Sequence, residues 1–119
     1  MDNSDILKEI KKAIDKDLLI VVEGKKDKRA LEFLGFRPEN ILIINVKGTV
    51  NEFIEGVIKK NKIVAIMTDF DSAGKKLYFR IKRELVKQGI RIDDRLRLAM
   101  LKAKVSHVEG LATFIENTG

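Results

Sequence analysis

Residues 18–24 read Leu-Leu-Ile-Val-Val-Glu-Gly, an unbroken apolar run that ends in an acid and a glycine. Such a run is typical of a strand that is buried on both faces of a parallel sheet. Residues 63–74 repeat the arrangement, because the apolar run from Ile63 to Met67 is followed by Thr-Asp-Phe-Asp-Ser-Ala-Gly. Ligands of open α/β sheets bind at the edge where the parallel strands end. Both acidic segments are therefore predicted to lie at that edge.

The remaining apolar residues predict helices and strands in alternation around these two segments. Helical spacing predicts helices over 6–14, 30–34, 50–58, 77–85 and 108–115, and segments 41–44 and 95–101 are predicted to be two further strands. This order predicts an α/β fold of three layers, with a mainly parallel four-stranded sheet flanked by helices in a Rossmann-like arrangement. The sequence shows no repeat, linker or low-complexity tract, so we expect a single domain over residues 1–119.

Composition narrows the class of protein and of partner. The chain has no cysteine, which excludes disulfides and thiolate zinc sites. It also lacks an apolar stretch near the roughly 20 residues of a membrane span, and its first residues are polar and acidic rather than signal-like. We therefore expect a cytoplasmic protein without a membrane partner. The net charge of +6 favours a polyanionic partner, and we expect nucleic acid, either DNA or RNA.

Glu23, Asp69 and Asp71 are the candidate catalytic and metal-binding residues. Side chains two positions apart on an extended strand point the same way, so Asp69 and Asp71 can face one cleft, and Glu23 joins them if the two strands are neighbours. Two like charges 4 Å apart repel by about 4 kcal/mol at an effective dielectric of 20. A cation, protons or nearby lysines must offset this repulsion. Mg²⁺ suits such a set of hard oxygen ligands.

Two other interpretations compete for the aspartates. Asp69 alone is also typical of a helix N-cap. Phosphatases of the haloacid dehalogenase type likewise use two aspartates one residue apart after a strand, although Ala73 stands where they have Thr or Val. Neither interpretation explains the matching Glu23-Gly24 segment, which favours the metal site.

The two acidic segments together resemble the Toprim module. Glu23-Gly24-Lys25-Lys26-Asp27, followed by Ala30-Leu31, is similar to its first motif, and Asp69-Phe70-Asp71-Ser72-Ala73-Gly74 is similar to its second. Topoisomerases of types IA and II, bacterial primases, recombination-repair proteins and a ribosomal-RNA maturation nuclease share this module. The resemblance covers about residues 18–101. It is greatest to the primase and maturation-nuclease branch, because that branch favours Glu-Gly-Lys-x-Asp in the first motif. Topoisomerases favour Pro at the position of Phe70.

The resemblance implies a chemistry. Glu23 would be a general acid or base with metal contact, and Asp69 and Asp71 would coordinate Mg²⁺, for which Mn²⁺ is a substitute. The protein would be a small stand-alone Toprim protein acting on the phosphodiester backbone of nucleic acids, as a nuclease-like enzyme. The alternative is a non-catalytic, metal-dependent module that binds nucleic acid or recruits a protein partner supplying further domains. A small-molecule phosphatase is a third hypothesis for the function. Tyr78 is the only tyrosine and is expected in the core, which argues against strand passage.

Basic residues flank both acidic segments. Lysines occupy helix starts, which normally favour acids, and a basic stripe follows on the second of these helices. The candidate phosphate-binding residues are Lys25, Lys26, Lys28, Lys75, Lys76, Arg80 and Arg83, and the stripe consists of Lys76, Arg80, Arg83 and Lys87. They either bind phosphate or neutralise the acids, and both can hold. Gly24 and Gly74 are the predicted backbone turns.

Weaker signals complete the sequence. Arg91, Arg95, Arg97, Lys102 and Lys104 are predicted to extend the basic surface. Most phenylalanines sit at core-like positions, so we expect little stacking on bases. Lys47-Gly48-Thr49 is either a backbone phosphate contact or an ordinary strand-to-helix turn, and we favour the turn. His107 is expected to be structural or at the surface, and Glu109 lies in a segment that is similar to one of the maturation nuclease.

Overall fold

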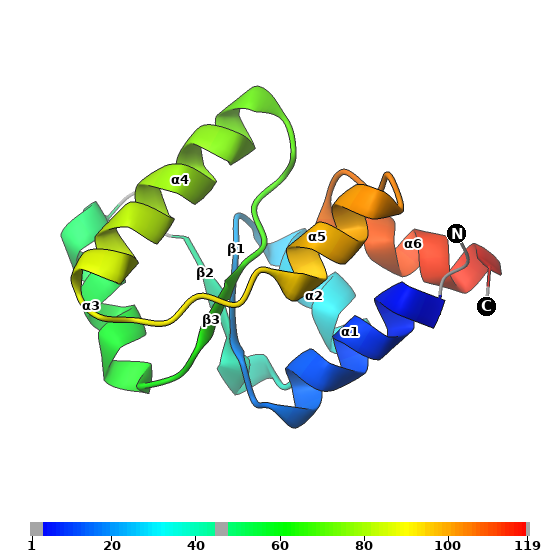
Figure 1. The fold of residues 1–119 in the computed structure, drawn as a ribbon, viewed down its shortest axis with the longest axis horizontal. Helices are drawn as coiled ribbons and strands as arrows, with labels where there is room; N and C mark the ends of the chain where they lie inside the picture. The colour runs from blue at the N-terminus through cyan, green and yellow to red at the C-terminus, as the bar shows by residue number, and fades with distance from the viewer. Residues whose placement is uncertain (1–3, 45–47, 119) are drawn as a thin grey trace.

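Three parallel strands form the centre of the protein in a computed structural model that describes residues 4–44 and 48–118 (Figure 1). The strands are β1 (Leu19–Val22), β2 (Ile41–Ile43) and β3 (Val64–Ile66), and their order in the sheet is β2-β1-β3. Ile20 of β1 pairs with Ile41 on one side and with Ala65 on the other. All four residues of β1 are buried, as expected for a central strand covered on both faces.

Helices cover both faces of this sheet. They are α1 (Ser4–Asp15), α2 (Lys25–Phe33), α3 (Val50–Lys60), α4 (Ser72–Lys87), α5 (Arg95–Lys102) and α6 (Val108–Thr118), with a short 3-10 helix η1 (Pro38–Asn40) before β2. In Figure 1, α3 and α4 lie on one side of the sheet and the other helices on the opposite side. Alternation along β1 divides the core in the same way: Leu19 and Val21 pack with residues of α3 and α4, whereas Ile20 and Val22 belong to the other cluster. The predicted three layers are confirmed.

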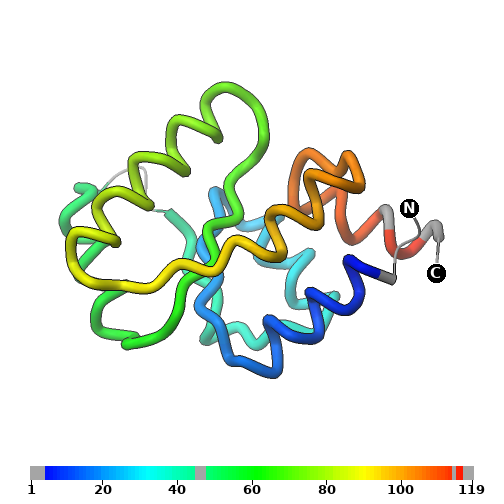
Figure 2. The backbone as a smooth tube through the Cα atoms, in the orientation of Figure 1, coloured from blue at the N-terminus to red at the C-terminus, as the bar shows by residue number. Residues whose placement is uncertain are grey.

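The predicted fourth strand over residues 95–101 is wrong. This segment is helix α5, whose buried apolar residues Leu96, Ala99 and Met100 follow the helical spacing of three and four. The alternation Arg-Leu-Arg-Leu at its start gave a strand-like period of two, but tertiary packing selects the helix. The place beside β3 is taken by residues 91–93. There the Val64 amide donates to the Arg91 carbonyl at 3.0 Å, and the Asp93 amide donates to the Val64 carbonyl at 2.8 Å. Figure 2 shows this stretch running from α4 back across the sheet to α5.

Local sequence explains where α3 begins and where α4 ends. Thr49 caps α3: its hydroxyl accepts from the Glu52 amide at 3.1 Å, while the Glu52 carboxylate accepts from the Thr49 amide. This geometry supports the interpretation of Gly48-Thr49 as an ordinary turn, and Lys47 lies outside the described residues. Gly89 follows α4 with a φ of +78°, the left-handed conformation that ends helices.

The helices of residues 4–44 and 48–118 are short or polar by the standard of membrane proteins. None of them is long and apolar enough to cross a bilayer.

Candidate functional site

The strand order places the topological switch point of the sheet between the carboxyl ends of β1 and β3. The chain leaves β1 for β2 on one side, and later enters β3 on the other side. In open α/β sheets, the point where the connections diverge in this way is where ligands bind. Glu23 follows β1 directly and Asp69 follows β3 closely, so both predicted acids lie at this point.

Glu23 and Asp69 are in direct contact. The Asp69 backbone amide donates a hydrogen bond of 2.7 Å to Oε2 of Glu23, across 46 positions of sequence. The condition under which Glu23 was expected to join the aspartates is met, because β1 and β3 are neighbours. The contact uses the backbone of Asp69, so its carboxylate is left for another role. A charged acceptor on a backbone amide makes a strong hydrogen bond, which fixes the start of the loop that follows β3.

Asp71, rather than Asp69, is the N-cap of α4. Oδ1 of Asp71 accepts from the Gly74 amide at 2.7 Å. Thr68, at the start of the loop between β3 and α4, also contacts Gly74, because its buried hydroxyl donates to the Gly74 carbonyl at 2.7 Å. Gly74 itself leaves no room for a side chain, since a Cβ there would lie 2.1 Å from the Asp69 carbonyl oxygen. Gly74 thus allows the helix to start against the Asp69 backbone.

Asp27 also lies near these acids, although it was named from the sequence only as part of the first motif and not as a site residue. Its carboxylate accepts from the Gly24 amide at 3.2 Å in the first turn of α2. Burial is the main cause that raises the pKa of the Asp69 carboxyl, and repulsion from Asp27 and Asp71 raises it further. Burial and the nearby Glu23 and Glu109 likewise raise the pKa of Asp27. We call Glu23, Asp27, Asp69 and Asp71 the acidic cluster.

Arg97 lies beneath this cluster instead of on the basic surface, which corrects the prediction for that residue. It is 7% exposed. Its guanidinium donates to the carbonyls of Ile66 at 3.2 Å and Thr68 at 2.8 Å, where β3 ends. It also stacks between the rings of Phe70 and Tyr78, at 4.4 and 4.3 Å from their centroids. Arg97 therefore braces the loop that carries Asp69 and Asp71, and adds a buried positive charge behind them.

The loop before α6 contacts the segment that carries Asp69 and Asp71. The Phe70 amide donates to the Ser106 carbonyl at 2.9 Å. His107, which follows, is exposed, and its charge lowers the pKa values of Asp27 and Asp69 against the larger causes that raise them. Glu109 acts on Asp27 alone, in the opposite sense. The C-terminal residues that the sequence ranked as minor therefore border the acidic cluster.

The acidic cluster offers suitable ligands for Mg²⁺ without a finished metal site. Carboxylate oxygens are the donors that Mg²⁺ prefers, and a divalent cation would relieve the repulsion that raises the pKa of Asp69. Within residues 4–44 and 48–118, however, no three His, Cys, Asp or Glu side chains are arranged to hold an ion as they stand. Because Asp71 serves as a helix cap, a shared ion requires its carboxylate or a neighbouring one to change rotamer.

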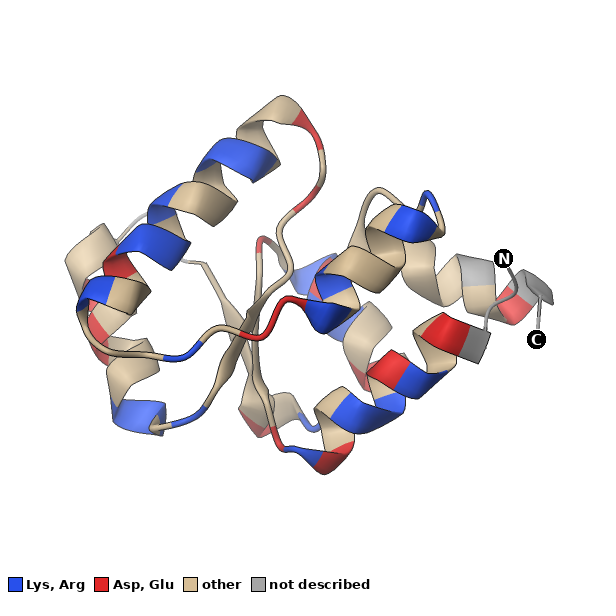
Figure 3. Cartoon of the chain, viewed as in Figure 1, with Lys and Arg blue, Asp and Glu red and all other residues tan. Residues whose placement is uncertain are grey.

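The predicted phosphate-binding residues border the cluster on two helices. Lys25, Lys26 and Lys28 lie in the first turns of α2, and Lys75 and Lys76 lie in those of α4. The stripe formed by Lys76, Arg80, Arg83 and Lys87 is exposed along α4. Figure 3 shows these charges recurring along α4, with acids in the loop before it. Glu84 contacts Arg83 at 3.7 Å and Lys87 at 3.5 Å, so one acid interrupts the stripe.

Asp27 and Arg97 were not assigned to the site from the sequence. Asp27 had a signal, because an acid three positions after a helix-starting glycine is placed to accept from that glycine's amide. Arg97 had no usable signal, since its burial depends on α5 being a helix. Gly24 has an extended backbone with a φ of −150°, which any residue adopts, so its predicted turn does not demand glycine.

Comparisons with known proteins give sequence relatives. No protein-family model matches the chain. The UPF0292 protein MJ1624 of Methanocaldococcus jannaschii is 35% identical over 79 residues, which are 66% of this chain and 60% of that protein. The UPF0292 protein TV1259 of Thermoplasma volcanium is 34% identical over 74 residues, which are 62% of this chain and 61% of that protein. The chain therefore spans about three fifths of the length of these relatives.

A solved structure shares the fold. A protein from Aquifex aeolicus superposes with a TM-score of 0.76 at 28% sequence identity, over 89% of this chain and 94% of that one. The chain is thus similar to UPF0292 proteins in sequence and to the Aquifex protein in architecture, and the resemblance to the Toprim module stays a prediction.

Proposed function

We propose that this protein is a Mg²⁺-dependent Toprim protein that acts on the phosphodiester backbone of nucleic acid, as a nuclease-like enzyme. One observation carries the proposal: the Glu23 carboxylate accepts a hydrogen bond of 2.7 Å from the Asp69 backbone amide, at the switch point between the ends of β1 and β3. The acids of both predicted motifs thereby share one site at the ligand-binding edge of the sheet.

The state of the acids supports a cation-dependent function. Burial, and then the neighbouring carboxylates of Asp27 and Asp71, raise the pKa of Asp69, and this arrangement costs stability without a counter-ion. Carboxyl groups with perturbed pKa values are typical of functional sites. Asp69, Asp71 and Glu23 would hold the ion, with Asp27 beside them. When bound, Mg²⁺ supplies charge stabilisation at a phosphoryl group.

The basic residues support the choice of substrate. Lysines at the starts of α2 and α4 flank the acids, and the exposed stripe on α4 extends away from them. A phosphodiester chain that follows the stripe would reach the acidic cluster at the start of α4. This arrangement fits a polymer of phosphates better than a single phosphate monoester.

A second candidate function is a binding module without turnover. Asp71 caps α4 and Glu23 holds the Asp69 amide, so both acids already have structural roles. In this alternative the acids shape a metal-dependent surface that binds nucleic acid or recruits a protein partner.

Cleavage assays with labelled RNA and DNA in Mg²⁺, and in parallel in Mn²⁺, test the proposal. We expect metal-dependent products, which Glu23→Gln reduces by about 10²-fold or more because a general acid or base is lost. Glu32→Gln is the matched control: it removes an exposed acid of α2 outside the cluster and should leave the rate unchanged.

The two candidates separate cleanly in these assays. Equal product from wild type and Glu23→Gln contradicts a catalytic role for Glu23. Metal-dependent binding without any product, measured by fluorescence anisotropy on the same oligonucleotides, supports the binding module instead.

A further inference from the structure

We propose that the groove between α4 and α5 holds an unpaired base of single-stranded nucleic acid, with Phe79 as its stacking partner. This inference rests on the proposed function and specifies its substrate, because it requires single-stranded nucleic acid next to the acidic cluster. Three observations carry it: the shape and lining of the groove, the geometry of Phe79, and the charge around it.

The groove has a volume of about 330 Å³ and a largely apolar lining. Phe79, Leu98 and Leu101 line it and are 65%, 53% and 55% exposed. Large apolar side chains gathered around one hollow mark a binding surface more often than scattered single ones do. A cavity of this size accommodates a nucleobase and its sugar.

Phe79 is held in place while one side of it stays open. Its ring centroid lies 5.0 Å from that of Tyr78, with the ring planes at 75°, an edge-to-face contact. Tyr78 is in turn fixed, because its hydroxyl donates to Asp94 at 2.7 Å and accepts from Lys82 at 3.0 Å. A positioned and exposed ring loses little conformational freedom when a flat ligand stacks on it.

The charges and the position of the groove select the occupant. Lys75, Arg97 and Asp94 line the groove, and Lys76 follows on the exposed face of α4. Lys82 pairs with Asp94 at 2.8 Å, so positive charge prevails around the groove. Phe70, another lining residue, stands between Asp69 and Asp71 in the sequence, so the groove adjoins the acidic cluster. An occupant must therefore combine a flat apolar ring with negative charge and extend toward the acids. An unpaired nucleotide within a strand has these properties, whereas the bases of a duplex are stacked on each other and closed to Phe79.

The exposure of two phenylalanines differs from what the sequence predicted. Most phenylalanines were expected at core-like positions, with little stacking on bases. Phe79 and Phe33 are instead 65% and 69% exposed. Phe33 lies at the end of α2 and does not line the α4–α5 groove, which makes it a matched control for Phe79.

The test compares single-stranded oligonucleotides with the duplexes of the same sequence, as DNA and as RNA, on the full chain. Affinity is measured by fluorescence anisotropy, and stacking by quenching of a fluorescent adenine analogue placed within the strand. We expect Phe79→Ala to weaken single-strand binding by roughly tenfold and to abolish the quenching, with duplex binding little changed. Phe79→Tyr should keep both signals, and Phe33→Ala should behave as wild type.

The inference alone is overturned by unchanged single-strand affinity in Phe79→Ala, or by an equal loss for single strand and duplex. Quenching that persists in Phe79→Ala also overturns it, because the analogue must then stack elsewhere. A wild-type protein that binds neither single strand nor duplex overturns the nucleic-acid partner of the proposed function as well, and this result distinguishes the two failures.

Discussion

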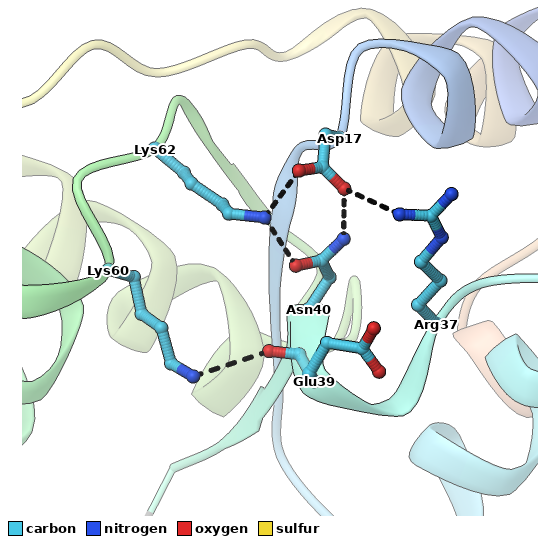
Figure 4. A network of polar contacts seen from close by, with 6 residues as sticks. All are labelled: Asp17, Arg37, Glu39, Asn40, Lys60 and Lys62. Atoms are coloured by element: carbon cyan, nitrogen blue, oxygen red, sulfur yellow. Dashed lines mark hydrogen bonds and ion pairs between the residues drawn. The ribbon is translucent and has the colours of Figure 1, made fainter.

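The two edges of the parallel sheet differ in the surroundings of their carboxylates, which are paired with a cation at one edge and lie among other acids at the other. At the amino edge, Asp17 precedes β1, Asn40 precedes β2 and Lys62 precedes β3. Lys62 donates to Asp17 and to Asn40 at 2.6 Å, and Asn40 donates to Asp17 at 2.5 Å, so one network joins all three strand starts (Figure 4). At the carboxyl edge, Asp69 stands among other acids.

The pKa values record this difference. Hydrogen bonds from Lys62 and Asn40 lower the pKa of the Asp17 carboxyl. Burial, then Asp27 and Asp71, raises the pKa of Asp69. The amino edge therefore stabilises the fold, because its carboxylate is paired. The carboxyl edge keeps an electrostatic penalty, and such penalties are more typical of functional sites than of purely structural ones.

The largest expected effect comes from disturbing the carboxyl edge through its backbone. In Gly74→Ala, the new Cβ would lie 2.1 Å from the Asp69 carbonyl oxygen, and backbone on both sides would have to move. We expect a loss of about 3 kcal/mol in the free energy of unfolding, at the upper end for overpacking. Chemical denaturation measures it.

Gly56→Ala is the control for this change. A Cβ at Gly56, in the middle of α3, meets nothing within 4 Å. Because Ala is the better helix former, this variant should gain roughly 0.5–1 kcal/mol. A Gly74→Ala protein as stable as wild type would show that the tight contact with Asp69 does not constrain the site.

The next effect concerns the amino edge. Asn40 is 5% exposed, and Asn40→Ala removes two hydrogen bonds from the network. Asp17 and Lys62 still pair at 2.6 Å, so the loss should stay near 1–2 kcal/mol. Urea denaturation at neutral pH checks this value. Asn51→Ala, at an exposed position of α3, is the matched control and should be close to neutral.

Asp71 allows the cap and the charge of the carboxyl edge to be separated. Asp71→Ala removes the acceptor of the Gly74 amide and should cost about 1 kcal/mol. Asp71→Asn keeps a good N-cap and should unfold like wild type. If Asp71 also holds a cation, Asp71→Asn nevertheless loses stabilisation by Mg²⁺ or Mn²⁺ in thermal melts. Equal metal response in both proteins would leave Asp71 with its capping role only.

The sequence predicted the elements that local residue patterns determine, and it failed for those that depend on contacts between distant parts of the chain. The strands at 18–22, 41–44 and 63–67 and the helices between them were predicted, because local apolar spacing sets them. Segment 95–101 was predicted wrongly, since its alternating start hides the helical burial of Leu96, Ala99 and Met100. No local pattern shows that residues 91–93 occupy the outer side of β3.

The candidate site divides in the same way. The meeting of Glu23 and Asp69 was predicted, because it follows from two strand ends and the condition that the strands are neighbours. Arg97 was assigned to the surface, since its burial between two rings depends on the packing of α5. The exposure of Phe79 was missed for a related reason: a phenylalanine beside an apolar helix face looks like core until the neighbouring helices are placed.

The smallest expected effect tests the opposition between the edges by pH. The folded-state pKa of Asp69 is raised, so its ionised form destabilises the protein at neutral pH, and this penalty disappears as the pH falls through that pKa. Asp69→Asn should therefore be more stable than wild type near pH 7, by less than about 1 kcal/mol because solvent screens the site. The pKa of Asp17 is lowered, so Asp17→Asn should be less stable near neutrality, and this difference should vanish as the pH falls through the folded-state pKa.

Thermal melts of both variants, from pH 7 down through the folded-state pKa values, measure whether each substitution stabilises or destabilises the protein. Mg²⁺ should stabilise the wild type, because it neutralises the charge that Asn removes, and it should leave Asp69→Asn unchanged. Asp17→Asn should respond to Mg²⁺ as wild type does, since its carboxylate lies at the other edge of the sheet. A loss of stability in Asp69→Asn at neutral pH would instead mean that Asp69 is already satisfied in the folded protein, and the contrast between the edges would fail.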